Sequence, residues 1–291
     1  MLPDGLFEKI RRLEVRTRGV VENVFGGEYR SAFKGRGIEF AEVRPYQVGD
    51  DIRTIDWNVS ARMDDTYVKV YEEERAQTVM LCVDVSASEN FGSQGGLKRD
   101  VAAEICAVMA FSAVLNNDKV GLLLFSDEVE GFVRPRSGRR HVLRCIRELF
   151  TAEPASRGTD IAGALQHVLR ILGRRSILVL VSDFFDTEYG TMLRAAARRH
   201  DTVGVELRDP REEELPPIGL VDLTDAETGE TVTLDTHDPA ARQAFAEAVQ
   251  ARRERTTTQL RQAGVPHVPV RTDTDYMEPL IEFFRERNRR G

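Results

Sequence analysis

The chain has 291 residues, a formal net charge of −7 and 31% charged residues. This length suits one large α/β domain with an appendage, or two domains, and the acidic balance argues against nucleic-acid binding. No apolar run reaches the roughly 20 residues of a membrane-spanning helix, and no apolar signal core is present at the N-terminus. The three cysteines form no Cys-x-x-Cys pair. We therefore expect a cytoplasmic protein with reduced thiols, no structural zinc and no integral membrane segment.

Two kinds of apolar pattern occupy the N-terminal part of the chain. Apolar residues at helical spacing predict an amphipathic helix near residues 4–24. Apolar residues then alternate with polar ones around residues 38–41 and again around 68–71, which is typical of half-exposed strands. A helix followed by a small β-rich module is therefore expected before the main domain.

Opposite charges surround the only tryptophan, Trp57, in the stretch between these two strands. Paired charges beside a large aromatic residue favour a structural role, so we expect Trp57 to be buried. We also expect Arg44 or Arg53 to form an ion pair with one of three nearby aspartates, namely Asp50, Asp51 or Asp56.

Val79 to Val83 form a short apolar run of strand-forming residues, as in a strand buried on both faces. Directly after it come Asp84, Ser86 and Ser88, an Asp-x-Ser-x-Ser triplet. Ligands of open α/β sheets bind outside the carboxyl ends of the strands. One carboxylate and two hydroxyls at such an end make an all-oxygen cluster suited to a hard cation.

Helices and strands alternate over the rest of the chain. We expect helices over 98–115, 139–150, 160–172, 191–200, 239–263 and 277–287, strands over 119–125, 129–133, 176–181, 202–207 and 268–270, and a hairpin over 220–234. Such alternation indicates parallel β-α units. The sequence therefore predicts an α/β fold, with a mostly parallel sheet flanked by helices.

Two later loops add oxygen ligands to the triplet. The first, residues 156–160, reads Ser-Arg-Gly-Thr-Asp, and the second follows the predicted strand 176–181 with Ser182 and Asp183. Together the three pieces resemble the metal-ion-dependent adhesion site of von Willebrand factor A domains. The five positions of that motif fall on Asp84, Ser86, Ser88, Thr159 and Asp183. The resemblance implies a von Willebrand factor A-like (Rossmann-like) fold and a bound Mg²⁺, with Mn²⁺ or Ca²⁺ as alternatives.

The N-terminal module carries a second resemblance. Residues 35–40 (Gly-Arg-Gly-Ile-Glu-Phe), 44–46 (Arg-Pro-Tyr), 49–53 (Gly-Asp-Asp-Ile-Arg) and 55–57 (Ile-Asp-Trp) are similar to the DUF58 family. The resemblance extends from about residue 30 to the C-terminus. It implies that this module precedes a von Willebrand factor A-like domain. Together with the helix predicted from periodicity, we expect an N-terminal helix and β-rich module over 1–78 and the von Willebrand factor A-like domain over 79–291. The resemblance also implies a MoxR-type AAA+ ATPase as partner.

The function expected from these residues is metal-dependent protein–protein interaction without enzymatic activity. The chain would act as an adaptor or co-chaperone-like partner of the ATPase, with a client protein as a further partner. Two alternatives stay open: a metal-dependent phosphoester hydrolase, and a scaffold with a vacant metal site. The sequence lacks a Gly-x-Ser-x-Gly elbow, and Ser86 stands where a haloacid-dehalogenase phosphatase has a second aspartate.

Overall fold

The computed structural model describes residues 8, 11, 13, 15, 29, 33, 38–63, 65–73, 76–93 and 96–290. The helix expected near residues 4–24 falls largely outside these residues. No helix in the described part of the chain is long and apolar enough to cross a membrane.

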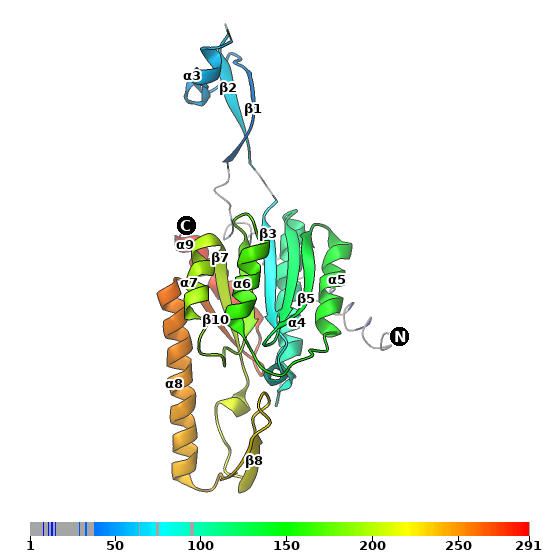
Figure 1. Cartoon of the computed structure of the whole chain (residues 1–291), viewed down its shortest axis with the longest axis vertical. Helices are drawn as coiled ribbons and strands as arrows, with labels where there is room; N and C mark the ends of the chain where they lie inside the picture. The colour runs from blue at the N-terminus through cyan, green and yellow to red at the C-terminus, as the bar shows by residue number, and fades with distance from the viewer. Residues whose placement is uncertain are drawn as a thin grey trace.

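A six-stranded sheet forms the centre of the molecule (Figure 1). Its strands, in spatial order, are β10 (His267–Arg271), β7 (Asp201–Arg208), β6 (Ile177–Ser182), β3 (Thr78–Asp84), β4 (Lys119–Phe125) and β5 (Val129–Arg136). All neighbouring pairs are parallel except β4 and β5, which are antiparallel. The prediction of an α/β fold with a mostly parallel sheet is confirmed.

Helices cover both faces of this sheet. One core cluster contains residues of α4 (Lys98–Leu115), α5 (Arg139–Phe150) and α9 (Met277–Arg290). The other contains residues of α6 (Ile161–Ile171), α7 (Gly190–Arg199) and α8 (Pro239–Ala263). Two buried faces require strands that are apolar at every position, which is why β3 and β6 are continuous apolar runs.

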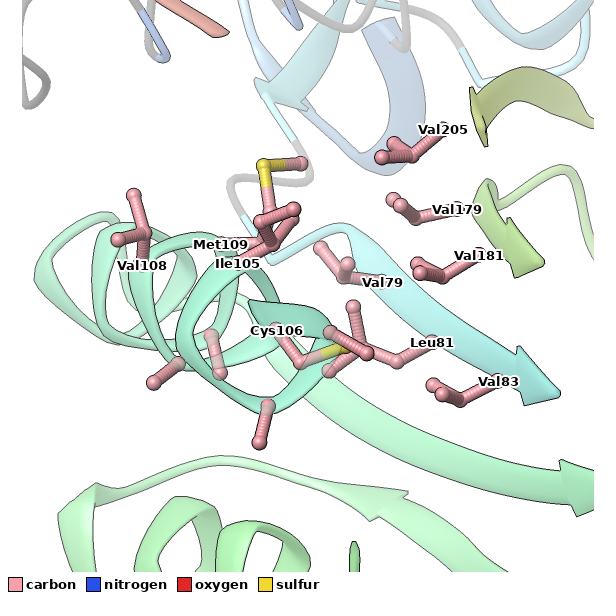
Figure 2. Packing of buried hydrophobic residues seen from close by; sticks show 14 of the residues in the cluster. Val79, Leu81, Val83, Ile105, Cys106, Val108, Met109, Val179, Val181 and Val205 are labelled. Carbon is pink, nitrogen blue, oxygen red and sulfur yellow. The ribbon is translucent and has the colours of Figure 1, made fainter. Parts of the chain in front are cut away.

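The central strand β3 shows how the two cores are divided. Val79, Leu81 and Val83 belong to the first cluster, and in Figure 2 they lie beside α4. Met80 and Cys82 belong to the second cluster, because successive side chains of a strand point to opposite faces. The cysteines of the chain are all buried free thiols (Cys82, Cys106 and Cys145).

The β-rich module consists of β1 (Ile38–Pro45) and β2 (Tyr67–Glu73), paired antiparallel, with η2 (Ile52–Thr54) and α3 (Trp57–Ser60) between them. Figure 1 shows this hairpin standing apart from the six-stranded sheet. The predicted strands are confirmed. The division of the chain into domains 1–78 and 79–291 stays a prediction.

The ion pair expected in this module is present, because Arg44 lies 2.7 Å from Asp50. The expectation that Trp57 is buried is wrong, since 71% of the residue is exposed. Asp56 explains the orientation: its carboxylate accepts hydrogen bonds from the amides of Asn58 and Val59 and caps α3. Trp57 is then the first residue of a one-turn helix at the surface of the module, where no core covers it.

The segment after β7 forms a second projection. It contains η4 (Pro210–Glu212) and a hairpin of β8 (Leu220–Thr224) and β9 (Thr231–Asp235), which pair only with each other. In Figure 1 this hairpin and the N-terminal part of α8 extend beyond the sheet, on the side opposite the β1–β2 module. The helix α8 ends at Gly264, which adopts the left-handed conformation (φ +70°) common at helix C-termini.

Candidate metal site

The candidate site lies where the chain changes direction across the sheet. From β3 the chain continues to β4 on one side, and it later returns to β6 on the other side of β3. Asp84 is the last residue of β3, and Asp183 directly follows β6. Adjacent parallel strands that end at a topological switch point form the usual ligand crevice of an open α/β sheet.

Hydrogen bonds hold the Asp-x-Ser-x-Ser loop in a buried arrangement. The Ser86 amide donates to Asp84 Oδ1 at 2.9 Å, and the Ser182 hydroxyl donates to Asp84 Oδ2 at 2.7 Å. The hydroxyls of Ser86 and Ser88 lie 3.1 Å apart. All four residues are buried. The loop therefore gathers a carboxylate and hydroxyl oxygens at the end of β3.

Glu89, in the 3₁₀ helix η3 (Ala87–Asn90), adds a carboxylate that the sequence analysis did not include. Its Oε1 accepts a hydrogen bond from the Asp183 amide at 3.1 Å, whereas its Oε2 is buried without a hydrogen-bond partner. One carboxylate oxygen from each of Asp84, Glu89 and Asp183 lies within 4.8 Å of the others. Three buried carboxylates therefore meet at this point.

The environment of these carboxylates disfavours their charge. Burial, together with the charge of Asp183, raises the pKa of Asp84 to about 7, although hydrogen bonds from Ser182 and Ser86 oppose the shift. Burial and the charge of Asp183 also raise the pKa of Glu89, against the effect of Lys98. A cation placed among them would reverse both effects.

Lys98, the first residue of α4, supplies one positive charge. Its Nζ lies 2.7 Å from Asp183 and 2.7 Å from Glu212, and the lysine side chain has no exposed surface. Burial opposes the ammonium charge, but the charges of Asp183, Glu89 and Glu212 outweigh burial and raise the pKa of Lys98. Nζ also lies 4.9 Å from the ring centre of Phe185. The lysine therefore contributes a positive charge to the cluster.

Thr159 lies on a neighbouring loop that is tied to the triplet, because the Ala87 amide donates to the Arg157 carbonyl at 3.0 Å. Its hydroxyl donates to Glu227 of the β8–β9 hairpin at 2.7 Å. Burial raises the pKa of Glu227, the hydrogen bond from Thr159 opposes this, and the charge of Asp183 adds to it. The structure thus brings Asp84, the two serines and Asp183 together, while the Thr159 hydroxyl is directed to an acid from the hairpin.

The donor set fits a hard divalent cation. Every candidate ligand is an oxygen, which Mg²⁺, Mn²⁺ and Ca²⁺ prefer. Glu89 Oε2 is a buried oxygen without a partner, and such atoms normally have one in native proteins. A cation bound between Asp84, Glu89 and Asp183 would satisfy that oxygen and separate the like charges.

Sequence reasoning missed the residues that complete the cluster, for different reasons. Glu89 directly follows Ser88, and Lys98 is one of only five lysines in the chain and precedes an apolar helix. An acid next to the triplet and a rare lysine at the start of the next helix could both have been recognised in the sequence as candidate site residues. Glu212 ends the 3₁₀ helix η4 and Glu227 lies in the turn between β8 and β9, and no local pattern indicates that either acid reaches the site.

Comparison with known proteins shows relatives over nearly the whole chain. The uncharacterized protein Mb1516 of Mycobacterium bovis is 35% identical over 283 residues, covering 96% of this chain and 89% of the relative. The uncharacterized protein Rv1480 of Mycobacterium tuberculosis matches with the same identity and coverage. These relatives therefore share both the N-terminal module and the sheet.

Two solved structures are similar at low identity. The conserved hypothetical protein BatB from Bacteroides thetaiotaomicron has a TM-score of 0.48 and 16% identity, covering 74% of this chain and 100% of that chain. The SpRpn10 VWA domain has a TM-score of 0.39 and 12% identity, covering 70% of this chain and 94% of that one.

A family model described as "Protein of unknown function DUF58" matches residues 42–255. The match begins within β1 and ends within α8, so it includes every residue of the carboxylate cluster. By this match, and by the relatives that extend along the whole sheet, the chain belongs to the DUF58 family.

Proposed function

We propose that this protein is a metal-dependent protein-interaction module. Asp84, Ser86, Ser88 and Asp183 would hold the cation with Glu89, and Thr159 would contribute from the neighbouring loop. The observation that carries the proposal is the buried Oε2 of Glu89, which has no partner although it lies within a cluster of three carboxylates. When bound, the cation would supply a positive centre for a carboxylate of a partner protein.

The charge balance supports a cation in addition to Lys98. Four carboxylates lie together in this region (Asp84, Glu89, Asp183 and Glu212), and Lys98 bonds to only two of them. The remaining negative charge is buried, which is costly unless it is paired. A divalent ion would offset most of this charge, whereas a second hydrogen-bond donor would not.

The side chains of this protein also prepare the site without the ion. Ser182 orients Asp84 from β6, and Lys98 fixes one oxygen of Asp183 through its ammonium group. The other oxygen of Asp183 accepts from the Phe185 amide at 3.2 Å. The ligands are therefore held before binding, which lowers the entropy lost when they order around a cation.

A second candidate function is a scaffold that binds no metal. The observation in its favour is Lys98, whose ammonium already lies at 2.7 Å from two acids of the cluster. In this case the Lys98 ammonium group would neutralise the acids in place of a metal ion, and a partner protein would bind to other surfaces.

Titration with Mn²⁺, followed by electron paramagnetic resonance of the free ion, separates the two candidates. We expect wild type to bind one ion, Asp84→Ala to lose binding, and Asp65→Ala, a change of an exposed aspartate in the β-rich module, to bind as wild type does. Equal binding by wild type and Asp84→Ala would overturn the proposed site. No binding by any form would favour the scaffold.

The proposed partner is a MoxR-type AAA+ ATPase, with a client protein as a third component. This proposal comes from the family resemblance and from the acceptor position that a bound cation would offer. Calorimetric titration against the MoxR-type ATPase of the same organism tests it. Binding should fail in Asp84→Ala and in EDTA, and added Mg²⁺ should restore only the EDTA sample.

A panel of phosphoester substrates with Mg²⁺ or Mn²⁺ tests the hydrolase alternative, which predicts turnover by wild type and none by Asp84→Ala.

A further inference from the structure

The β8–β9 hairpin places one acid at the edge of the candidate site. Glu227 lies at the tip of the hairpin, and its Oε1 accepts a hydrogen bond from the Thr159 hydroxyl at 2.7 Å across 68 positions of sequence. Within the tip, residues 225–230, Glu227 is the residue that is not fully exposed. The contact therefore joins the hairpin to a residue of the proposed metal site.

The turn that carries Glu227 is well defined. Asp225 Oδ1 accepts hydrogen bonds from the amides of Glu227 and Thr228, both at 2.8 Å. The Asp225 amide donates to the Glu230 carbonyl at 2.8 Å, and Gly229 adopts φ +75°, which suits glycine. These bonds hold the turn in one shape, so Glu227 is presented toward Thr159 by the backbone and not by a free loop.

This placement is unfavourable unless a cation is near. The Glu227 carboxylate is partly buried against Thr159, on the loop that a hydrogen bond ties to the Asp-x-Ser-x-Ser segment and its buried carboxylates. Among the described residues, Glu227 forms no ion pair. An acid is the ligand class that a cation at this site would accept from a partner protein, and the hairpin supplies such an acid from within the chain.

The hairpin is attached in a way that allows its tip to leave. Its two strands form a separate sheet and pair with no strand of the main sheet. Its base is fixed by the buried Thr236, whose hydroxyl accepts from the Ile218 amide at 2.9 Å and donates to the Gly219 carbonyl at 2.8 Å. Within the part of the chain that the structure describes, the side-chain hydrogen bond that joins the tip to the site is the one from Thr159 to Glu227.

We propose that Glu227 is an internal acidic ligand, which occupies the position that a partner's carboxylate takes on the proposed cation. Binding of a partner then requires the hairpin tip to leave Thr159, so the hairpin regulates access to the site. This inference rests on the proposed metal site. It predicts that removing the Glu227 carboxylate opens a coordination position without removing the ligands that hold the ion.

Water-proton relaxation of bound Mn²⁺ measures that position. The forms compared are wild type, Glu227→Ala and the matched control Glu230→Ala, which removes an exposed acid from the same turn. All three should bind Mn²⁺. The relaxivity of each bound ion should rise in Glu227→Ala, because one more exchanging water reaches the ion, and should be unchanged in Glu230→Ala. Added acetate should then lower the relaxivity of Glu227→Ala at concentrations that leave wild type unaffected.

The outcomes separate this inference from the function on which it rests. If Mn²⁺ binds to every form and Glu227→Ala has the relaxivity and acetate response of wild type, Glu227 is not a ligand and the inference is overturned, while the metal site stands. If Mn²⁺ binds to none of the forms, the metal site is overturned and the internal ligand with it.

Discussion

The Lys98 ammonium lies 2.7 Å from the Asp183 carboxylate, and neither side chain has exposed surface. The two residues come from different elements, since Lys98 begins α4 and Asp183 directly follows β6. A buried pair of this kind makes each partner depend on the other, because removing one leaves an uncompensated charge in the interior.

Lys98→Met should destabilise the protein by about 3–5 kcal/mol in EDTA. The substitution keeps much of the side-chain volume but leaves Asp183 and Glu212 without their cation. Urea unfolding measures the change, with Lys119→Met, at an exposed position, as the control. Mg²⁺ should recover part of the loss if the proposed site binds it. Equal midpoints for wild type and Lys98→Met would contradict the structural part assigned to this lysine.

Trp57→Ala should change the free energy of unfolding by no more than about 0.5 kcal/mol, as is usual for exposed positions. The reason is the exposure of the indole on the surface of the β-rich module. Val68→Ala, at a buried position of β2, should cost about 1–3 kcal/mol and shows that the assay detects this module. A loss at Trp57 as large as that at Val68 would mean that the tryptophan is packed in the folded protein.

Glu206 should make a pH-dependent contribution to the free energy of unfolding, at a position away from the proposed metal ligands. It is buried at the end of β7, and its Oε2 lies 2.6 Å from His267 Nε2 and also accepts from Arg208. Burial would raise the pKa of Glu206, but the bonds from His267 and Arg208 outweigh it, so the pKa is lowered. The unfolded chain therefore binds the proton more readily than the folded protein does.

Glu206→Gln should accordingly cost about 1.5–3 kcal/mol at pH 7, the range for hydrogen bonds to a charged group. The difference from wild type should stay constant down to about pH 4.3, the ordinary pKa of a glutamate, and shrink as pH falls through the lowered pKa. Unfolding curves at several pH values measure this, with the exposed Glu188→Gln as control. A difference that grows on acidification would have the wrong sign.

Asp209 should hold Ser93, which follows the Asp-x-Ser-x-Ser segment in the chain, in its place. Its carboxylate is buried and accepts from the Ser93 amide at 2.9 Å, the Ser93 hydroxyl at 2.6 Å and the Thr272 hydroxyl at 2.7 Å. It also accepts from the Arg211 amide at 2.9 Å. Asp209→Ala removes all four bonds. The Ser93 amide should exchange its hydrogen faster, and the protein should lose about 1.5–3 kcal/mol. Unchanged protection at Ser93, relative to an amide in β3, would show that Asp209 does not hold Ser93 in place.

Much of the fold could be predicted from local patterns. The helices over 98–115 and 239–263 have the predicted bounds, and the buried strands lie within a residue or two of theirs. Side-chain periodicity reports which faces of an element are buried, and a strand apolar at every position must lie between two layers. The ends of β3 and β6 were therefore visible in the sequence, together with the acids that follow them.

The composition of the candidate site depended on contacts between distant segments. Lys98 reaches Asp183 across 85 positions and Glu212 across 114. No local pattern encodes such pairs, because the free energy of a buried charge depends on which groups packing brings within a few ångströms.

The exposure of Trp57 was likewise decided by tertiary structure. Opposite charges near an aromatic residue indicate local pairing, and the pair between Arg44 and Asp50 is present. Whether the aromatic ring is covered depends on a second layer, and the described residues place none over α3. The sequence by itself determined the elements, their order and the acids at the strand ends. Only the folded structure decided which distant charges meet those acids, because loops approach one another through the packing of the elements that carry them.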